Sequence, residues 1–346
     1  MFTVYSEEHA LHAGGAELSA GVLVPCYDAP SRAEMILARV RSAGLGPVVA
    51  PEDHGRGPIE RVHSPRFLEF LSTAWEQWQA CGYHEAALPS IWPGRHLRAV
   101  EPDNIAGKLG YYCFDASTPL VAGSFRAAYA AAQVALSAAA RLASQGARRE
   151  RAAFALCRPP GHHAASDLYG GYCFLNNAAI AAQALRDVGA ARVAVLDVDY
   201  HHGNGTQAIF YDRPDVLFLS LHGDPRTEFP FFLGHADERG AGEGDGYNVN
   251  YPLPRGSGFG AWSEALEDAC RRIERYAPDA LVISLGVDSY KDDPICSFRL
   301  ESADFTTYGR RIAQLRRPTL FVMEGGYAVE QIGINAVNVL QGFEEA

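Results

Sequence analysis

Five short apolar runs, which alternate with amphipathic stretches from about residue 150 onward, constrain the fold more than any other feature. Each run has about four to eight residues, is rich in Val, Ile, Leu and Phe, and is apolar on both faces, as buried parallel strands are. The runs span residues 152–157, 192–197, 215–221, 280–286 and 319–323. Their alternation with helical segments predicts a single α/β domain over residues 1–346, with a mostly parallel central sheet and helices on both faces.

The segments between these runs predict the helices. Residues 176–188 and 261–276 have helical periodicity, and Gly189 and Pro278 follow them as helix terminators. A longer, alanine-rich helix is expected over about residues 124–144, ending near Gly146. Two stretches, 83–120 and 223–247, read as irregular, and long loops of a compact domain usually form functional rims or interfaces.

Charge and cysteine content restrict the partners and the compartment. The net charge of −11 argues against nucleic-acid binding, which needs a basic face to neutralise phosphates. The seven cysteines are scattered and include no C-x-x-C pair, so neither a disulfide framework nor a structural zinc cluster is expected. No signal-peptide pattern is visible, and no apolar run approaches the roughly 20 residues that cross a bilayer. We therefore expect a cytoplasmic protein without a membrane partner.

Residues suited to chemistry follow all five apolar runs. They lie at positions 158–163, 197–204, 222–224, 288 and 324–327. In an open parallel sheet, ligands bind beyond the carboxyl ends of the strands. The five groups are therefore predicted to face one crevice.

A metal site is predicted at two of these strand ends. Side chains of an extended segment alternate, so Asp197, Asp199 and His201 are expected on one side. A carboxylate and an imidazole two residues apart can reach one cation, and Asp288 is the expected third ligand. Three protein ligands leave a position open for water and substrate, as in catalytic sites. Oxygen and nitrogen donors suit Zn²⁺, and also Fe²⁺, Co²⁺ or Mn²⁺.

Two other motifs supply acid–base and electrophilic groups. His162 and His163 follow a Pro-Pro-Gly turn, and one of them could take a proton from water and return it to a leaving amine. An imidazole suits this task because its ordinary pKa, about 6.5, lies near neutral pH. Tyr327 follows a Gly-Gly turn, and its hydroxyl could stabilise the oxyanion of a tetrahedral intermediate.

With these motifs the chain resembles the acetylpolyamine amidohydrolases, within the histone-deacetylase superfamily of the arginase–deacetylase fold. The resemblance runs essentially from end to end and implies a sheet of about eight strands. Its other motifs are residues 25–34, Gly110-Tyr111-Tyr112, residues 170–177, residues 284–288 and Asp293-Pro294.

The resemblance implies a role for each catalytic residue. Asp199, His201 and Asp288 would bind one Zn²⁺ per chain, or Fe²⁺ or Co²⁺. His163 would be the general base and acid, and His162 its electrostatic partner. The remaining implied catalytic residues are Tyr327, which polarises the acetyl carbonyl, and Asp197, the carboxylate behind His162.

Two further sites are implied by the resemblance. The substrate tunnel would have walls of Gly171, Tyr172 and Phe229, with Ile295 near its mouth. A structural potassium ion would be bound by Asp197, Asp199, His201, Ser220 and Leu221.

The position behind the second histidine departs from the family pattern. Asn204 stands where many members have an aspartate. The departure removes a charge, so we expect His163 to be less basic than in those relatives.

The tunnel mouth departs as well. Polyamine-type members have an extended loop, here about residues 83–118, that narrows the tunnel through a homodimer contact, so a homodimer is implied. Acids that meet a cationic amine are expected from this loop, but Ala106 and Ser117 stand there. The acids nearby are Glu101, Asp103 and Asp115.

The sequence therefore predicts a zinc-dependent hydrolase of linear amide bonds that deacetylates small cationic amines, above all acetylputrescine and acetylcadaverine. The enzymatic alternative is a deacetylase of protein acetyl-lysine or of other small amides. A metal-stabilised binding protein without turnover is opposed by the presence of both histidines and Tyr327. An arginase-like ureohydrolase would need more carboxylates, for two metal ions.

Overall fold

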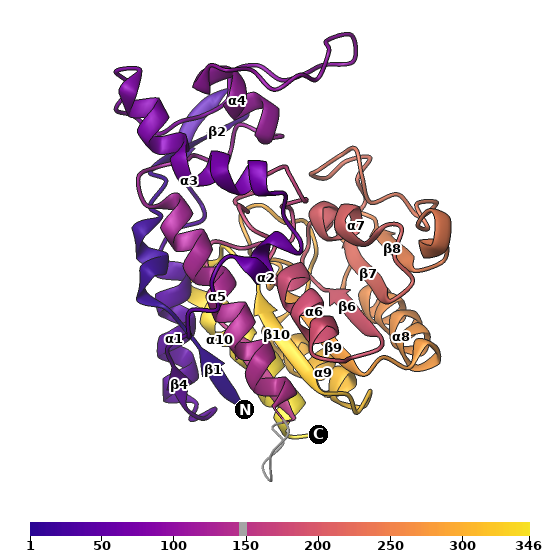
Figure 1. Cartoon of the computed structure of the whole chain (residues 1–346). Helices are drawn as coiled ribbons and strands as arrows, with labels where there is room; N and C mark the ends of the chain where they lie inside the picture. The colour runs from indigo at the N-terminus through magenta and orange to yellow at the C-terminus, as the bar shows by residue number, and fades with distance from the viewer. Residues whose placement is uncertain (145–150) are drawn as a thin grey trace.

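The computed structural model describes residues 1–144 and 151–346 (Figure 1). Its strands are β1 (Phe2–Val4), β2 (Ala16–Ser19), β3 (Val22–Pro25), β4 (Val48–Val49), β5 (Ala152–Ala155), β6 (Val193–Asp197), β7 (Val216–Gly223), β8 (Asn248–Leu253), β9 (Ala280–Leu285) and β10 (Thr319–Met323). Its helices are α1 (Ser31–Ser42), α2 (Gly57–Glu60), α3 (Pro65–Ala80), α4 (Ile105–Tyr112), α5 (Ser124–Ala143), α6 (Asn177–Asp187), α7 (Asn204–Phe210), α8 (Phe259–Tyr276), α9 (Ser302–Ala313) and α10 (Val329–Glu344).

Eight strands form one sheet, in the order β4-β1-β5-β10-β9-β6-β7-β8. Every neighbouring pair in it is parallel, while β2 and β3 form a separate antiparallel hairpin. The five strands expected from the apolar runs are β5, β10, β9, β6 and β7, which are consecutive in this order. Their carboxyl ends therefore meet along one edge, and the predicted α/β domain is confirmed.

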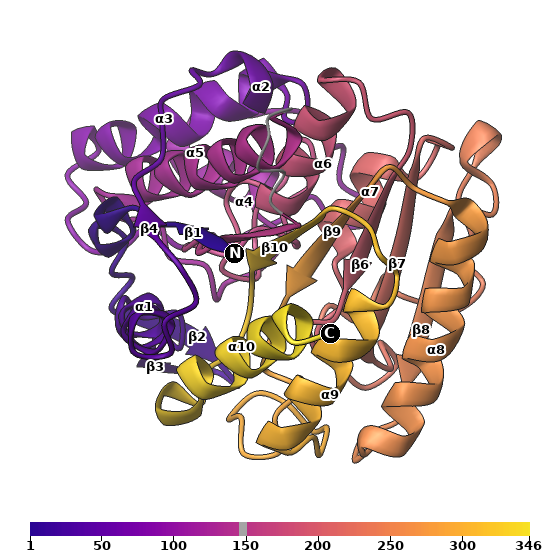
Figure 2. The same ribbon diagram turned by 90° about the horizontal axis from the view of Figure 1, so that it is seen from below.

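Helices cover both faces of the sheet (Figure 2). The helices α2, α3, α5 and α6 lie on one face, and α1, α8, α9 and α10 lie on the other. Alternation along β6 shows how one strand serves both layers, because Val193 and Val195 join one apolar core whereas Ala194 and Leu196 join the other. A strand buried on both faces must be apolar throughout, which is the pattern seen in the sequence.

The predicted helices are present with small shifts at their ends. Helix α6 begins after Asn176, whose side chain accepts a hydrogen bond from the Ala179 amide at 2.9 Å, and it ends before Gly189, which has a φ of +110°. Helix α8 begins at Phe259, earlier than expected. Helix α5 extends to Ala143, and the predicted end near Gly146 lies outside the described residues.

The stretch 83–120 was predicted to be irregular, and the structure corrects this prediction. It contains α4, whose first turn is capped by the Asn104 side chain, and a bridge between Ala87 and Leu120 joins its ends. The helix was not predicted because it has only eight residues and includes two glycines, which are poor helix formers. In the parts of the chain described by the structure, no helix combines the length and apolarity required to span a bilayer.

Candidate active site

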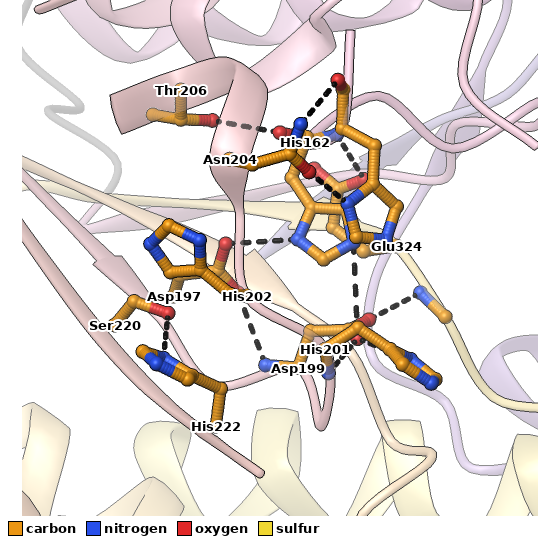
Figure 3. Close-up of polar contacts among 12 residues, drawn as sticks. His162, Asp197, Asp199, His201, His202, Asn204, Thr206, Ser220, His222 and Glu324 are labelled. Carbon is orange, nitrogen blue, oxygen red and sulfur yellow. Dashed lines mark hydrogen bonds and ion pairs between the residues drawn. The ribbon is translucent and has the colours of Figure 1, made fainter. Parts of the chain in front are cut away.

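Four neighbouring strand ends bring the predicted chemical groups together, and Figure 3 shows groups from the ends of β5, β6 and β10. The turn after β5 carries His162 and His163, and the loop after β6 carries Asp199 and His201. Asp288 follows β9, and the turn after β10 ends at Tyr327. All of these side chains are buried or nearly so. Four of the five predicted groups therefore lie together at this edge of the sheet, whereas His222 of the fifth group packs against His202.

Asp199, His201 and Asp288 form the group best suited to hold a cation. One ligand atom from each lies within 4.8 Å of the other two, and the group is buried. His201 Nδ1 lies 2.9 Å from Asp288 Oδ2 and 3.4 Å from Asp199 Oδ1. Two carboxylates and one imidazole match the donors of a catalytic zinc site, so the residues present fit the metal.

The charges of this group also favour a divalent cation. Burial and the neighbouring charge of Asp199 raise the pKa of Asp288 to about 8. Burial alone would lower the pKa of His201, but hydrogen bonds with Asp199 and Asp288 raise it to about 10. A bound cation would compete with these protons, because metal ligands must be deprotonated.

Two glycines make room for these carboxylates. A Cβ at Gly286 would lie 2.0 Å from Asp199 Oδ2, and a Cβ at Gly325 would lie 2.5 Å from the same oxygen. The Gly325 amide also donates a hydrogen bond to this oxygen at 2.8 Å. No side chain fits at either position, which explains the Gly-containing strand ends of β9 and β10.

Asp197 and Asp199 both face the His162 ring, Asp197 at Nδ1 and Asp199 at Nε2. Strand β6 ends at Asp197, so Asp199 and His201 lie in the loop beyond it. Asp197 Oδ2 lies 2.9 Å from His162 Nδ1, as the family resemblance implied. Burial would lower the pKa of His162, but the charges of Asp197 and Asp199 raise it to about 10. His162 is therefore the charged member of the histidine pair.

His163 has the opposite electrostatic character. Its Nδ1 lies 2.6 Å from Asn204 Oδ1, while the Asn204 amide nitrogen faces the His163 carbonyl at 3.4 Å. This orientation makes Nδ1 the donor and leaves Nε2 free to accept a proton. Burial and the nearby rings of His162 and His201 hold the pKa of His163 well below its ordinary value.

Asn204→Asp is expected to shift the acid limb of the pH–kcat/KM profile toward higher pH. A carboxylate next to Nδ1 stabilises protonated His163 and so raises its pKa. A general base must be unprotonated, so activity falls as pH drops through its pKa, and a higher pKa moves that fall upward. Asn204→Ser, which adds no charge, is the control. If the acid limb does not move in Asn204→Asp, it does not report the protonation of His163.

Tyr327 follows β10 and is buried. Its ring packs against Tyr172 with 5.5 Å between centroids, and the Arg32 guanidinium lies 4.7 Å from its centroid. Burial raises the pKa of its phenol well above the ordinary value. The hydroxyl consequently stays protonated and can donate a hydrogen bond to a developing oxyanion.

A cavity of about 430 Å³ opens onto these groups. Gly171, Tyr172, Phe229 and Ile295, the four predicted tunnel residues, all line it, together with His163, His201 and Tyr327. The Phe229 ring stands edge-on to His163, with 5.0 Å between centroids, and stacks with Phe114 at 5.8 Å. Phe114 was not predicted from the sequence.

The acids near the predicted mouth are mostly engaged elsewhere. Glu101 pairs with Arg66 and Lys108, and the half-buried Asp115 accepts a hydrogen bond from the Gly171 amide at 2.6 Å. Asp103 is exposed. Among the described residues that line the cavity, the acids are Glu17 and Glu228. Glu228 is paired with Arg255, whereas Glu17 accepts hydrogen bonds from the neutral Tyr172 hydroxyl and Tyr27 amide.

The predicted potassium ligands also lie close together. Asp197 on β6 pairs in register with Ser220 on β7, and Leu221 follows it. Asp197 Oδ1 accepts a hydrogen bond from the Asp199 amide at 3.1 Å, and Ser220 Oγ lies 2.8 Å from His222 Nδ1 (Figure 3). The potassium site stays a prediction.

Glu324 begins the predicted group of residues 324–327, but the sequence predicted no role for it. In the structure it lies behind the histidine turn. Its Oε2 accepts hydrogen bonds from the Gly161 and His162 amides at 2.6 and 3.1 Å. Burial raises its pKa to about 7. With His162 and Cys173 it forms a second group of potential metal ligands. The Asp199, His201 and Asp288 group is the better metal site, because His201 opens onto the cavity.

Comparison with known proteins identifies the family. The histone deacetylase domain matches residues 27–343. Acetylpolyamine amidohydrolase 2 of Pseudomonas aeruginosa is 61% identical over 344 residues, which cover 99% of each chain. Acetylpolyamine amidohydrolase of Mycoplana ramosa is 50% identical over 342 residues, again 99% of each chain. The crystal structure of acetylpolyamine aminohydrolase from Burkholderia pseudomallei has a TM-score of 0.94 and 44% identity, covering 99% of this chain and 98% of that one.

The parallel sheet, the match to the histone deacetylase domain and the similar amidohydrolases identify the protein as a hydrolase that acts on acetyl amide bonds. The chain belongs to the histone deacetylase family, and the resemblance to acetylpolyamine amidohydrolases is confirmed along its length. This fold implies a catalytic metal, typically zinc.

Proposed function

We propose that the protein removes the acetyl group from acetylated polyamines, with acetylputrescine and acetylcadaverine as the foremost substrates. The observation that carries this proposal is the cavity, which is lined by His201 of the candidate metal group, by His163 and Tyr327, and by aromatic side chains and Glu17. The names of the P. aeruginosa and M. ramosa relatives support the same substrate class. A cavity with aromatic walls and an acid suits a chain that ends in an ammonium group.

Each residue of the site would have a separate task. Asp199, His201 and Asp288 would hold Zn²⁺, which supplies Lewis-acid polarisation and a lowered pKa for water when bound. His163 would take a proton from the attacking water at Nε2 and pass it to the leaving amine nitrogen as the amide C–N bond breaks. Tyr327 would donate a hydrogen bond to the oxyanion. Acetate and a free amine are the products.

A substrate panel tests the function. The purified protein, loaded separately with Zn²⁺, Fe²⁺ or Co²⁺, is assayed with acetylputrescine, acetylcadaverine and an acetyl-lysine peptide. We expect kcat/KM to be higher for both small amines than for the peptide with at least one metal. A clear preference for the peptide under all three metals would overturn the polyamine proposal and leave the deacetylase chemistry intact.

Glu17→Gln is expected to weaken discrimination between charged and neutral substrates. The pair to compare is acetylputrescine and N-pentylacetamide, which has a methyl group in place of the terminal ammonium. Burial raises the pKa of Glu17, and a bound ammonium would favour its charged form. We expect the kcat/KM ratio of this pair to fall about tenfold, or about 1.4 kcal/mol. Glu228→Gln is the control, because Arg255 already neutralises that acid. An unchanged ratio in Glu17→Gln would show that a group other than Glu17 recognises the ammonium.

Homodimer formation through the loop at about 83–118 is part of the proposal. Three apolar side chains in this loop, Ile91, Leu97 and Val100, are 61%, 58% and 54% exposed. Exposed apolar side chains gathered in one loop favour a protein contact. Sedimentation of the purified protein distinguishes a dimer from a monomer.

The proposed compartment is the cytoplasm, where thiols remain reduced. All seven cysteines are free in the structure. The proposed structural potassium ion would bind at Asp197 and its neighbours, and metal analysis would detect it.

A further inference from the structure

The backbone of Tyr327 is held by a carboxylate from another loop. The Tyr327 amide donates a hydrogen bond to Asp293 Oδ2 at 2.7 Å, and the Ala328 amide donates to the same oxygen at 3.2 Å. Asp293 lies in the loop after β9, and its side chain is buried, with a residue exposure of 6%. The two residues are therefore joined although they come from different strand ends.

The second oxygen of the same carboxylate holds the cavity wall. The Ile295 amide donates a hydrogen bond to Asp293 Oδ1 at 3.2 Å, and Ile295 lines the cavity beside Tyr327. One carboxylate thus receives three amide N–H groups from two segments. An asparagine could not replace it, because its amide NH₂ would face one set of donors.

A second side chain holds the part of the turn that precedes Tyr327. Arg32 donates hydrogen bonds to the Gly326 carbonyl at 2.5 Å and to the Glu324 carbonyl at 2.6 Å. These bonds hold the residues before Tyr327, whereas Asp293 holds Tyr327 itself and the residue after it. Loss of Asp293 would free the tyrosine while leaving the start of the turn in place.

We propose that Asp293 is a positioning residue for Tyr327, fixing the phenol at the distance from the substrate carbonyl that oxyanion stabilisation requires. This inference rests on the proposed function, since it assumes that Tyr327 acts in deacetylation. Misplacing a catalytic group by about 1 Å can cost about 100-fold in rate. Asp293 is not in the candidate metal group and is not among the residues that line the cavity, whereas Tyr327 does line it, so Asp293 would act through the tyrosine.

The first test compares Asp293→Asn with Asp292→Asn. Asp292 is the exposed neighbour on the same loop and controls for the loss of one negative charge. With acetylputrescine we expect Asp293→Asn to lower kcat about 10- to 100-fold and to change KM less than about threefold. Asp292→Asn should retain wild-type kinetics. Metal content and melting temperature are measured for both variants.

The deciding test is a double-mutant cycle with Tyr327→Phe. If Asp293 acts through the tyrosine hydroxyl, Asp293→Asn should cost less than about twofold in kcat in the Tyr327→Phe background. A loss that is the same in both backgrounds would overturn the inference, because it would show that Asp293 supports the fold or the metal site. Inactivity of the wild-type protein toward every acetyl amide would instead defeat the proposed function.

Hydrogen exchange of the wild-type protein provides a test that needs no variant to fold. The Tyr327 and Ala328 amides lie beyond β10, and Asp293 supplies their acceptor. We expect both amides to exchange at least about 100-fold more slowly than exposed loop amides such as that of Asp292. Exchange as fast as that of Asp292 would rule out the contact and the inference with it.

Discussion

Asp288→Ala is expected to lose the catalytic metal and at least about 1000-fold of the deacetylase activity, a loss of about 4 kcal/mol of transition-state stabilisation. The variant removes one of two carboxylates from a three-ligand group. It also removes the hydrogen-bond acceptor of His201 Nδ1 and of the Tyr200 amide, both of which Asp288 now serves. Metal content is measured by atomic emission, and kcat/KM with acetylputrescine.

Two controls separate metal loss from unfolding. Asp292→Asn, on the exposed part of the same loop, should keep its metal and its activity. The melting temperature of Asp288→Ala should lie below that of the metal-loaded wild type, because a bound ligand stabilises the folded state, and at or below that of the chelated wild type, because two hydrogen bonds are also lost. A variant that retains one tightly bound metal ion per chain would contradict the assignment of Asp288.

The central sheet could be predicted because its strands are buried on both faces. Such strands leave continuous apolar runs, and β10 matches its run at both ends. The strands β1, β4 and β8 gave no such signal. The first two are very short, and β8 lies at the edge of the sheet, where four of its six residues are only partly buried. Local sequence patterns carry little information about strands of this kind.

The site was predictable where chemistry follows a strand directly. Asp199, Asp288 and Tyr327 are each placed by the strand before them, so the order of the chain was enough to gather them. Glu17 was missed because it comes from the β2–β3 hairpin, and its approach to Tyr172 depends on a contact between segments 155 residues apart. Nothing in the neighbourhood of Glu17 in the sequence indicates that contact.

Backbone recognition was equally invisible in the sequence. Asp293 and Glu324 act on amide N–H groups, which every residue other than proline possesses. A motif can reveal that such acids are present, but the donors they meet are set by the packing of two loops. The distinction between His162 and His163 was partly visible, since Asn204 was expected to make His163 less basic. The structure supplies the other cause, which is burial beside His162 and His201.

His163→Ala is expected to lower kcat for acetylputrescine by about 100- to 10,000-fold, the usual range for a general acid–base group. His163 lines the cavity and has a free Nε2, whereas His162 is directed toward Asp197 and is not among the residues that line the cavity. The metal content of His163→Ala should remain that of the wild type, because its ring centroid lies 6.2 Å from that of His201 and it is not in the ligand group.

The pH profile and chemical rescue complete this test. Wild-type activity falls at acid pH as His163 becomes protonated, so the corresponding limb should disappear from the residual activity of His163→Ala. Added imidazole should restore part of the rate, since the substitution vacates space beside Phe229. His162→Ala should lose less activity than His163→Ala and should retain the acid limb. If His162→Ala were the more damaged variant and imidazole rescued it instead, the general base would have to be reassigned to His162, with Asp197 as its partner.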